Sequence, residues 1–239
     1  MLFRCAPSGI VVGVALRVVS ELLAVVVPPA CVVCRVALSR ADLRLCGDCT
    51  RALPWLPVRV CRRCGLPAHR RSCPAAGAAF ARAWAPLAYD GVARELVAAL
   101  KFRAALPVAA LMAAHIAANL PADLRVPATL VPVPAQPARH RRRGFDPAAE
   151  LAASLATRLA LAQSACLQRR DRQRPQVGAT RVQRRRSGRL TIELRSPPPE
   201  RALLIDDVHT TGATLDACAR TLRAGGCREV IAITYARTL

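Results

Sequence analysis

The chain has 239 residues, enough for one large domain or for a domain of about 150 residues with a smaller companion. Hydrophobic residues make up 53% of it, which excludes a protein that is disordered throughout, and aromatic residues only 3%, so the core must consist of Ala, Val and Leu. The formal charge is +21, yet Lys101 is the only lysine among 36 basic residues. This bias towards arginine indicates a coding preference, so the charge alone does not indicate a nucleic-acid partner.

The first 30 residues are apolar but are not expected to form a membrane span. Arg17, Ser20 and Glu21 interrupt the run, which never reaches the ~20 apolar residues that cross a bilayer. Arg17 also lies where a secretory signal would need its apolar stretch. Residues 1–30 are expected to form an amphipathic helix that packs on the rest of the protein, with a membrane-surface helix as the alternative. We expect a cytoplasmic protein without a transmembrane segment, which could associate with a membrane only through this helix or a partner.

Seven of the eleven cysteines lie between residues 31 and 73, and six of those seven form three C-x-x-C pairs. Without an export signal, this pattern indicates metal ligands in a reducing compartment rather than disulfides. Two of the pairs suit one tetrahedral zinc ion, because each is a tight turn that presents two thiolates. The ligands of this site are Cys31, Cys34, Cys46 and Cys49.

A second cysteine set follows and lacks one member. Cys61, Cys64, His69 and Cys73 have a spacing close to that of a zinc knuckle, but Ala76 stands where a further C-x-x-C would end. The alternatives are a degenerate site with His69 in solvent, or ligand pairing that crosses between the two sets. The sequence therefore predicts one or two zinc ions of structural type in a double zinc ribbon-like domain over residues 31–78.

From about residue 80 onwards, helical patterns alternate with short β-branched runs, which predicts parallel βαβ units. The patterns indicate buried strands separated by helices that begin at capping residues or proline and end at glycine. The expected elements are a helix over 91–112 broken or kinked at Pro107, a strand over 129–134, a helix over 147–161 capped by Asp146, a strand over 202–205, a loop over 206–212, a helix over 213–224 and a strand over 230–234.

The loop after the strand at 202–205 carries the clearest chemistry. Thr210, Thr211 and Thr214 offer hydroxyls, while Gly212 and Ala213 let backbone N–H groups approach an anion at a helix N-terminus. Asp206 and Asp207 are acceptors, suited to a vicinal diol or to a Mg²⁺ ion shared with the ligand. A diol beside a phosphate is the chemistry of a ribose 5-phosphate.

This loop resembles the motif that binds 5-phosphoribosyl 1-pyrophosphate (PRPP) in type I phosphoribosyltransferases, and the whole chain resembles the ComF family. The other residues that carry the resemblance are Leu100-Lys101-Phe102, Pro132-Val133-Pro134, Arg139, Arg143-Gly144-Phe145 and Pro175-Gln176-Val177-Gly178. The resemblance implies an α/β fold, with a type I phosphoribosyltransferase-like parallel sheet flanked by helices over residues 80–239 and a small zinc-ribbon domain before it. Asp146-Pro147 and Ser187-Gly188 depart from the pattern of the family, as does the missing fourth cysteine.

The resemblance also implies roles for the loop residues. Asp206 and Asp207 would hold the ribose hydroxyls and be the catalytic candidates, and residues Thr210 to Thr214 would hold the 5-phosphate. Arg139 and Arg143 suit the diphosphate of PRPP, since arginine offers planar bidentate donors. Lys101, a compact ammonium kept where arginine is otherwise used, is a further phosphate candidate, although a single lysine can also survive by chance.

Residues 139–189 hold fourteen arginines against Asp146, Glu150 and Asp171, a local charge of 14 − 3 = +11. Such a stretch suits nucleic-acid phosphates, but Phe145 is its only aromatic residue, so base stacking has little support there. The alternatives are a solvated loop or contacts to the diphosphate.

The ComF resemblance implies a protein that binds PRPP and handles single-stranded DNA in natural transformation. A competence helicase or another DNA-processing protein would be its partner. One alternative is an active phosphoribosyltransferase that transfers ribose 5-phosphate to an unknown acceptor. The other is a zinc-ribbon docking protein that PRPP regulates.

Overall fold

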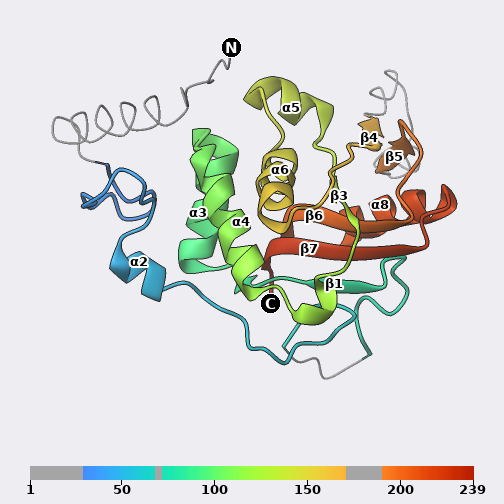
Figure 1. Cartoon of the computed structure of the whole chain (residues 1–239), viewed down its shortest axis with the longest axis horizontal. Coiled ribbons are helices and arrows are strands. Elements are labelled where there is room, and N and C mark those ends of the chain that lie inside the picture. The colour runs from blue at the N-terminus through green and yellow to red at the C-terminus, as the bar shows by residue number, and fades with distance from the viewer. Residues whose placement is uncertain (1–28, 68–71, 171–189) are drawn as a thin grey trace, which may run out of the picture. The chain divides into compact units, whose positions relative to one another are not determined.

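The computed structural model describes residues 29–67, 72–170 and 190–239 (Figure 1). Its contacts divide the chain into two compact units, with the boundary between Ala52 and Leu53. The first unit contains α2 (Gly47–Arg51) and the second contains every strand of the described residues. The boundary of the units therefore falls inside the module expected over residues 31–78, between its two cysteine sets. The helix expected before residue 29 lies outside the described residues.

The second unit is built on a five-stranded parallel sheet. Its strands are β1 (Arg82–Trp84), β2 (Leu87–Ala88), β3 (Thr129–Pro132), β6 (Arg201–His209) and β7 (Glu229–Arg237). The order is β1–β7–β6–β3, with β2 also pairing with β7, and every pair is parallel. Both faces of a parallel sheet are covered, which explains the runs of Leu, Ile, Val and Ala in β6 and β7.

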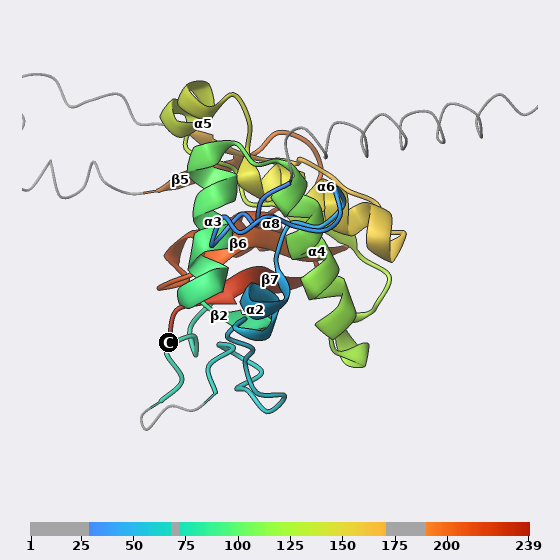
Figure 2. The same ribbon diagram turned by 90° about the vertical axis from the view of Figure 1, so that its left-hand side faces the viewer.

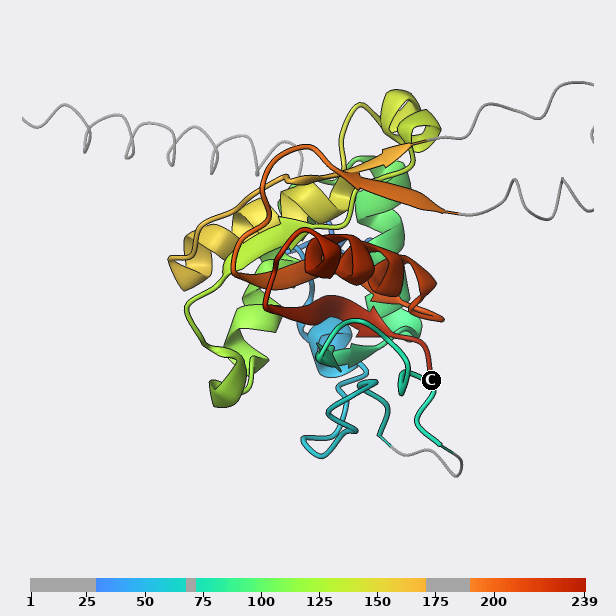
Figure 3. The same cartoon turned by 90° about the vertical axis from the view of Figure 1, so that its right-hand side faces the viewer.

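Helices cover both faces of this sheet (Figure 2 and Figure 3). On one face, α6 contacts β3 and β6, and α4 packs between α3 and α6; on the other face, α8 contacts β6 and β7. The predicted α/β fold with a parallel sheet flanked by helices is thus confirmed. The helices are α3 (Gly91–Arg103), α4 (Pro107–Asn119), α5 (Pro137–Arg143), α6 (Pro147–Leu159) and α8 (Ala213–Ala224), with a 3₁₀ turn at Ala122–Leu124.

Local sequence signals account for several helix boundaries. The expected break at Pro107 separates α3 from α4, where Ala104 adopts the left-handed conformation that ends α3. Asp146 caps α6 as expected, its Oδ1 accepting a hydrogen bond from the N–H of Ala148 at 3.0 Å.

One boundary was predicted wrongly. The expected loop over 206–212 begins later, because β6 continues through Asp206 and Asp207 as far as His209. Pairing with β7 extends it: Asp206 lies opposite Thr234, and His209 opposite Arg237. The two carboxylates therefore stand on a rigid strand rather than on a loop.

Two short strands precede and follow the last part of the predicted basic stretch, residues 171–189. β4 (Leu167–Arg170) and β5 (Thr191–Leu194) pair antiparallel beside α8. The residues between them, including Pro175-Gln176-Val177-Gly178 and half of the arginines of the predicted basic stretch, lie outside the described residues. In the described part of the chain, no helix has the length and apolarity needed to span a membrane.

Candidate functional site

A crevice opens at the carboxyl ends of the adjacent strands β3 and β6. The chain leaves β3 towards α6 on one face of the sheet and leaves β6 towards α8 on the other. Where the connections of neighbouring parallel strands diverge in this way, α/β sheets bind their ligands. The residues that line this pocket are Lys101, Val133, Pro134, Ala135, Gln136, Arg139, Arg143, Asp146, Pro147, Ala148, Arg169, Asp206, Asp207, Val208, Thr210 and Thr214.

Lys101 and Asp207 form an ion pair at the base of the crevice. Lys101 Nζ, in the last turn of α3, lies 2.6 Å from Asp207 Oδ1 on β6, and the Asp207 side chain is 8% exposed. Asp206 Oδ1 accepts a hydrogen bond from the N–H of Asp207 at 2.8 Å. Burial, together with the neighbouring Asp207 carboxylate, raises the pKa of Asp206 well above its ordinary value. The two acids are therefore unequal: Asp207 is paired with an ammonium, whereas burial and the neighbouring carboxylate disfavour ionisation of Asp206.

Asp146 joins two segments that line the crevice. While its Oδ1 caps α6, its Oδ2 accepts a hydrogen bond from the N–H of Ala135 at 2.8 Å. The loop after β3 is thereby fixed to the N-terminus of α6. The departure from the ComF pattern at Asp146-Pro147 thus has a structural role here, in which the proline also occupies the first turn of the helix.

The predicted phosphate-binding residues lie on two sides of one loop. Thr210 and Thr214 line the crevice, whereas Thr211, Gly212 and Ala213 line a second pocket that Cys64, Phe80 and Arg237 also border. Gly212 has φ +81°, and a Cβ at this position would lie 2.7 Å from Nε2 of His209. Only glycine can adopt this positive φ and also avoid the contact with His209 without strain.

Two arginines enter the crevice from α5. Arg139 and Arg143 line it, and the guanidinium carbon of Arg143 lies 5.1 Å from the centre of the Phe102 ring. Burial and the nearby Arg139 lower the pKa of Arg143 below its ordinary value. Among the described residues, the buried Nε of Arg143 has no hydrogen-bond partner. A buried donor without a partner in a crevice suits an anionic ligand.

The burial of His209 predicts that the free energy of unfolding depends measurably on pH. This residue is 3% exposed, and burial together with Arg237 lowers its pKa to about 4, from an ordinary value of 6.5. Between these values the unfolded chain binds the proton and the folded chain does not, so the stabilisation is complete above pH 6.5 and is lost as the pH falls towards 4. The wild type should lose about 2 kcal/mol more than His209→Gln in its free energy of unfolding between pH 7.5 and pH 5.

Urea denaturation of both proteins at the two pH values measures this difference. Other titrating groups, including the thiols that release metal in acid, contribute equally to both proteins and cancel. The control is His140→Gln, at an exposed histidine of α5. This variant should lose as much free energy of unfolding between pH 7.5 and pH 5 as the wild type does. Parallel pH profiles for the wild type and His209→Gln would contradict the assignment.

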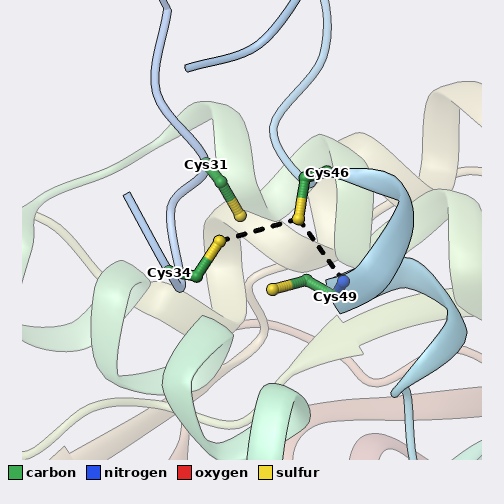
Figure 4. A group of neighbouring side chains, drawn as sticks. All are labelled: Cys31, Cys34, Cys46 and Cys49. Carbon is green, nitrogen blue, oxygen red and sulfur yellow. Dashed lines mark hydrogen bonds between the residues drawn. The ribbon is translucent and has the colours of Figure 1, made fainter. Parts of the chain in front are cut away.

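The first cysteine set converges as the spacing predicts (Figure 4). The four sulfurs of Cys31, Cys34, Cys46 and Cys49 all lie within 4.8 Å of one another, and Sγ of Cys34 is 3.6 Å from Sγ of Cys46. Four sulfurs at about 2.3 Å from one tetrahedral ion would stand about 3.8 Å apart. The donor set and its geometry therefore fit a structural zinc ion.

The electrostatics of this cluster also favour a cation. Burial raises the pKa of Cys49 to about 12. Burial acts in the same direction on Cys31, but backbone N–H donors, including that of Cys34, outweigh it and lower the pKa of Cys31 to about 6. Without a cation, the crowded thiols cannot all ionise. A divalent ion would stabilise all four thiolates at once.

The second set contains a knuckle with the same backbone bonds as the first. Cys31 N donates to Val36 O and Arg35 N to Cys31 O; likewise Cys61 N donates to Leu66 O and Gly65 N to Cys61 O. Cys61 Sγ lies 3.9 Å from Cys73 Sγ, and the sulfurs of Cys61, Cys64 and Cys73 lie within 4.8 Å of one another. The expected fourth ligand, His69, lies outside the described residues. The three cysteines fit a second zinc site.

Several residues of these pockets were not predicted from the sequence, among them three with basic side chains. Arg169 lines the crevice, while His209 and Arg237 lie beneath the phosphate loop. No local motif marks them, because their positions depend on the pairing of β6 with β7 and on the place of β4.

Comparison with known proteins covers both parts of the chain. The model of the double zinc ribbon domain matches residues 22–80. DNA utilization protein YhgH of Salmonella typhimurium is 32% identical over 232 residues, which cover 89% of this chain and 99% of that protein. DNA utilization protein YhgH of Escherichia coli K12 is 29% identical over 226 residues, with the same coverage of both chains. The chain belongs to the ComF-like family of the DNA utilization protein YhgH, and its N-terminal part is a double zinc ribbon.

Proposed function

We propose that the crevice between β3 and β6 binds PRPP. The observation that carries this proposal is the placement of Lys101, Asp206, Asp207, Thr210 and Thr214 around one pocket at the carboxyl edge of the sheet. The carboxylates of Asp206 and Asp207 would accept hydrogen bonds from the ribose hydroxyls. Thr210, Thr214 and the N-terminus of α8 would hold the 5-phosphate.

The opposite wall of the crevice suits the diphosphate. Arg139 and Arg143 face the pocket from α5, and Lys101 lines the same pocket. The free Nε of Arg143 would donate to a diphosphate oxygen. A bound Mg²⁺ ion would neutralise part of the charge of the diphosphate. Calorimetric titration with PRPP in magnesium buffer tests the proposal, and we expect tighter binding than for ribose 5-phosphate, which lacks the diphosphate.

Transfer of the phosphoribosyl group is a second candidate for the same crevice, favoured by the arginines on its diphosphate side. The bond from ribose C1 to the diphosphate oxygen would break, with the electron pair leaving on diphosphate. A new bond from C1 to the acceptor nucleophile would form, and the proton of the acceptor would go to solvent. Release of diphosphate from PRPP in the presence of purine and pyrimidine bases tests this activity. Binding without release would leave the protein a PRPP-binding protein.

We further propose that the exposed face of α5 contacts single-stranded DNA. The relatives are named for DNA utilization, and α5 contains four consecutive basic residues, His140 to Arg143. Arg141 and Arg142 are exposed and have no carboxylate partner among the described residues. Unpaired arginines on one short helix are available to phosphate groups, so binding should depend strongly on salt.

Replacing Arg141 and Arg142 together by Gln should reduce the salt dependence of single-strand binding. If each arginine neutralises one phosphate, the slope of log K against log salt should fall in magnitude by about 1.4. Fluorescence anisotropy with a labelled oligothymidine at several salt concentrations measures the slope. Arg228→Gln is the matched control, because Arg228 is exposed but paired with Glu200 at 2.8 Å. Equal slopes for the double variant and the wild type would exclude α5 from the DNA site.

A further inference from the structure

Arg237, the last residue of β7, connects the second cysteine set with the phosphate loop. The residue is only 6% exposed. Its Nε donates to the carbonyl oxygen of Cys64 at 3.1 Å. Its Nη1 donates to the carbonyl oxygens of His209, at 2.8 Å, and of Thr210. One guanidinium thus holds the backbone of a cysteine knuckle at one end and the end of β6 at the other.

These hydrogen bonds set the direction of the peptide groups in the loop. In a trans peptide, the C=O and the following N–H point to opposite sides. With the carbonyls of His209 and Thr210 directed at Arg237, the N–H groups of Thr210 and Thr211 point away from it. Arg237 therefore holds the carbonyl oxygens, which repel an anion, on one side of the loop. The amide N–H groups, which can donate to an anion, are presented on the other side.

Other bonds join the same two regions. Asp216, in the first turn of α8, accepts a hydrogen bond from the N–H of Ala79 at 2.7 Å, and Arg220 donates to the carbonyl of Gly77 at 3.2 Å. The knuckle itself is packed tightly, since a Cβ on Gly65 would lie 3.3 Å from the carbonyl oxygen of Ala83 in β1. A change of the knuckle backbone would therefore reach the loop through Arg237 and α8.

We propose that Arg237 is a positioning residue, through which the Cys61–Cys64–Cys73 cluster keeps the loop at Thr210–Thr214 in its phosphate-binding conformation. The proposal rests on the proposed PRPP site. It makes metal binding at the cluster and phosphate binding at the loop two linked events, each favouring the other. The first cluster, at Cys31, Cys34, Cys46 and Cys49, belongs to the other compact unit and should not take part.

The test combines a cluster variant with an Arg237 variant. Cys61→Ser should lower the affinity for PRPP by about tenfold, a typical size for coupling between two sites. In an Arg237→Gln background, where affinity is already low, Cys61→Ser should change it by less than about twofold. Cys34→Ser in the first cluster and Arg228→Gln just before β7 are the matched controls, and both should keep wild-type affinity. Titration calorimetry measures the affinity of the wild type and of all five variants, with zinc content determined for each protein.

Hydrogen exchange gives a second readout that does not need PRPP to bind. Removing zinc from the wild type with a graded chelator should speed exchange at the amides of residues 210–216 by about tenfold. In Arg237→Gln, these amides should exchange fast with or without zinc. A purely structural arginine would lower thermal stability yet leave the zinc response intact, and that result would overturn the proposal. If PRPP does not bind but the zinc response is present, the proposed ligand is wrong and the coupling stands.

Discussion

Replacing Asp207 by Ala should lower the affinity for PRPP by about a hundredfold or more. Asp207 is buried on β6, beside the position proposed for the ribose hydroxyls. Two hydrogen bonds to a charged acceptor contribute about 1.5–3 kcal/mol each, and about 2.7 kcal/mol corresponds to a hundredfold change. The substitution also leaves Lys101 as a partly buried cation without its carboxylate partner, and this unpaired charge destabilises the free protein.

A second variant separates these two effects. In the double variant Lys101→Met/Asp207→Ala, the unpaired ammonium is removed together with the carboxylate. If Asp207 contacts the ribose, the double variant should bind PRPP no better than Asp207→Ala. Recovery of wild-type affinity would instead show that Asp207 serves only to hold Lys101, and the proposed contact to the ribose would be wrong.

The matched control for both variants is Asp123→Asn. Asp123 is also an ion-paired acid of the same unit, with its Oδ2 2.6 Å from Arg82 Nη1, but it does not line the crevice. Its substitution should leave the affinity for PRPP within about twofold of the wild type, as for a surface ion pair distant from the ligand. Calorimetric titration in magnesium buffer measures each affinity. Equal affinities for the wild type and Asp207→Ala would contradict the assignment of the site.

The part of the fold that local signals determine was predicted correctly. The buried run at 202–205, the glycines at 225 and 226 and the apolar stripe between them indicated the β6–α8–β7 unit, and its elements lie where they were expected. The length of β6 was not predictable in the same way. It depends on pairing with β7, which extends both strands beyond their apolar runs to His209 and Arg237.

For the crevice, many of the lining residues could be predicted from the sequence, but their arrangement in space could not. Lys101 and Asp207 are 106 positions apart, so their ion pair depends on where the tertiary fold places the end of α3 relative to β6. Helix α5 gave no signal, because none of its residues is buried and it has no apolar stripe. The Cys-x-x-Cys spacing, in contrast, predicted both clusters, since each pair is a local turn that needs no tertiary information. It did not predict that the two clusters belong to different units.

Replacing Cys49 by Ser should remove one zinc ion per chain and unfold the described part of the first unit. Only a few residues of that part are buried, and two of them, Cys31 and Cys49, are themselves proposed ligands. So small a core cannot stabilise a fold without a metal, whose binding contributes about 10–16 kcal/mol to small zinc domains. Native mass spectrometry measures the zinc content, and hydrogen exchange of residues 29–52 measures the unfolding.

The controls use the other cysteines of the chain. Cys218→Ala, at a buried cysteine of α8 outside both clusters, should retain all the zinc, whereas Cys61→Ser should lose only the zinc of the second site. Because Cys49 and Cys61 lie in different compact units, Cys49→Ser should leave the melting temperature of the α/β unit unchanged, while Cys61→Ser should lower it. Loss of all zinc in Cys49→Ser would show that ligand pairing crosses between the two sets. Retention of all zinc would show that Cys49 is not a ligand.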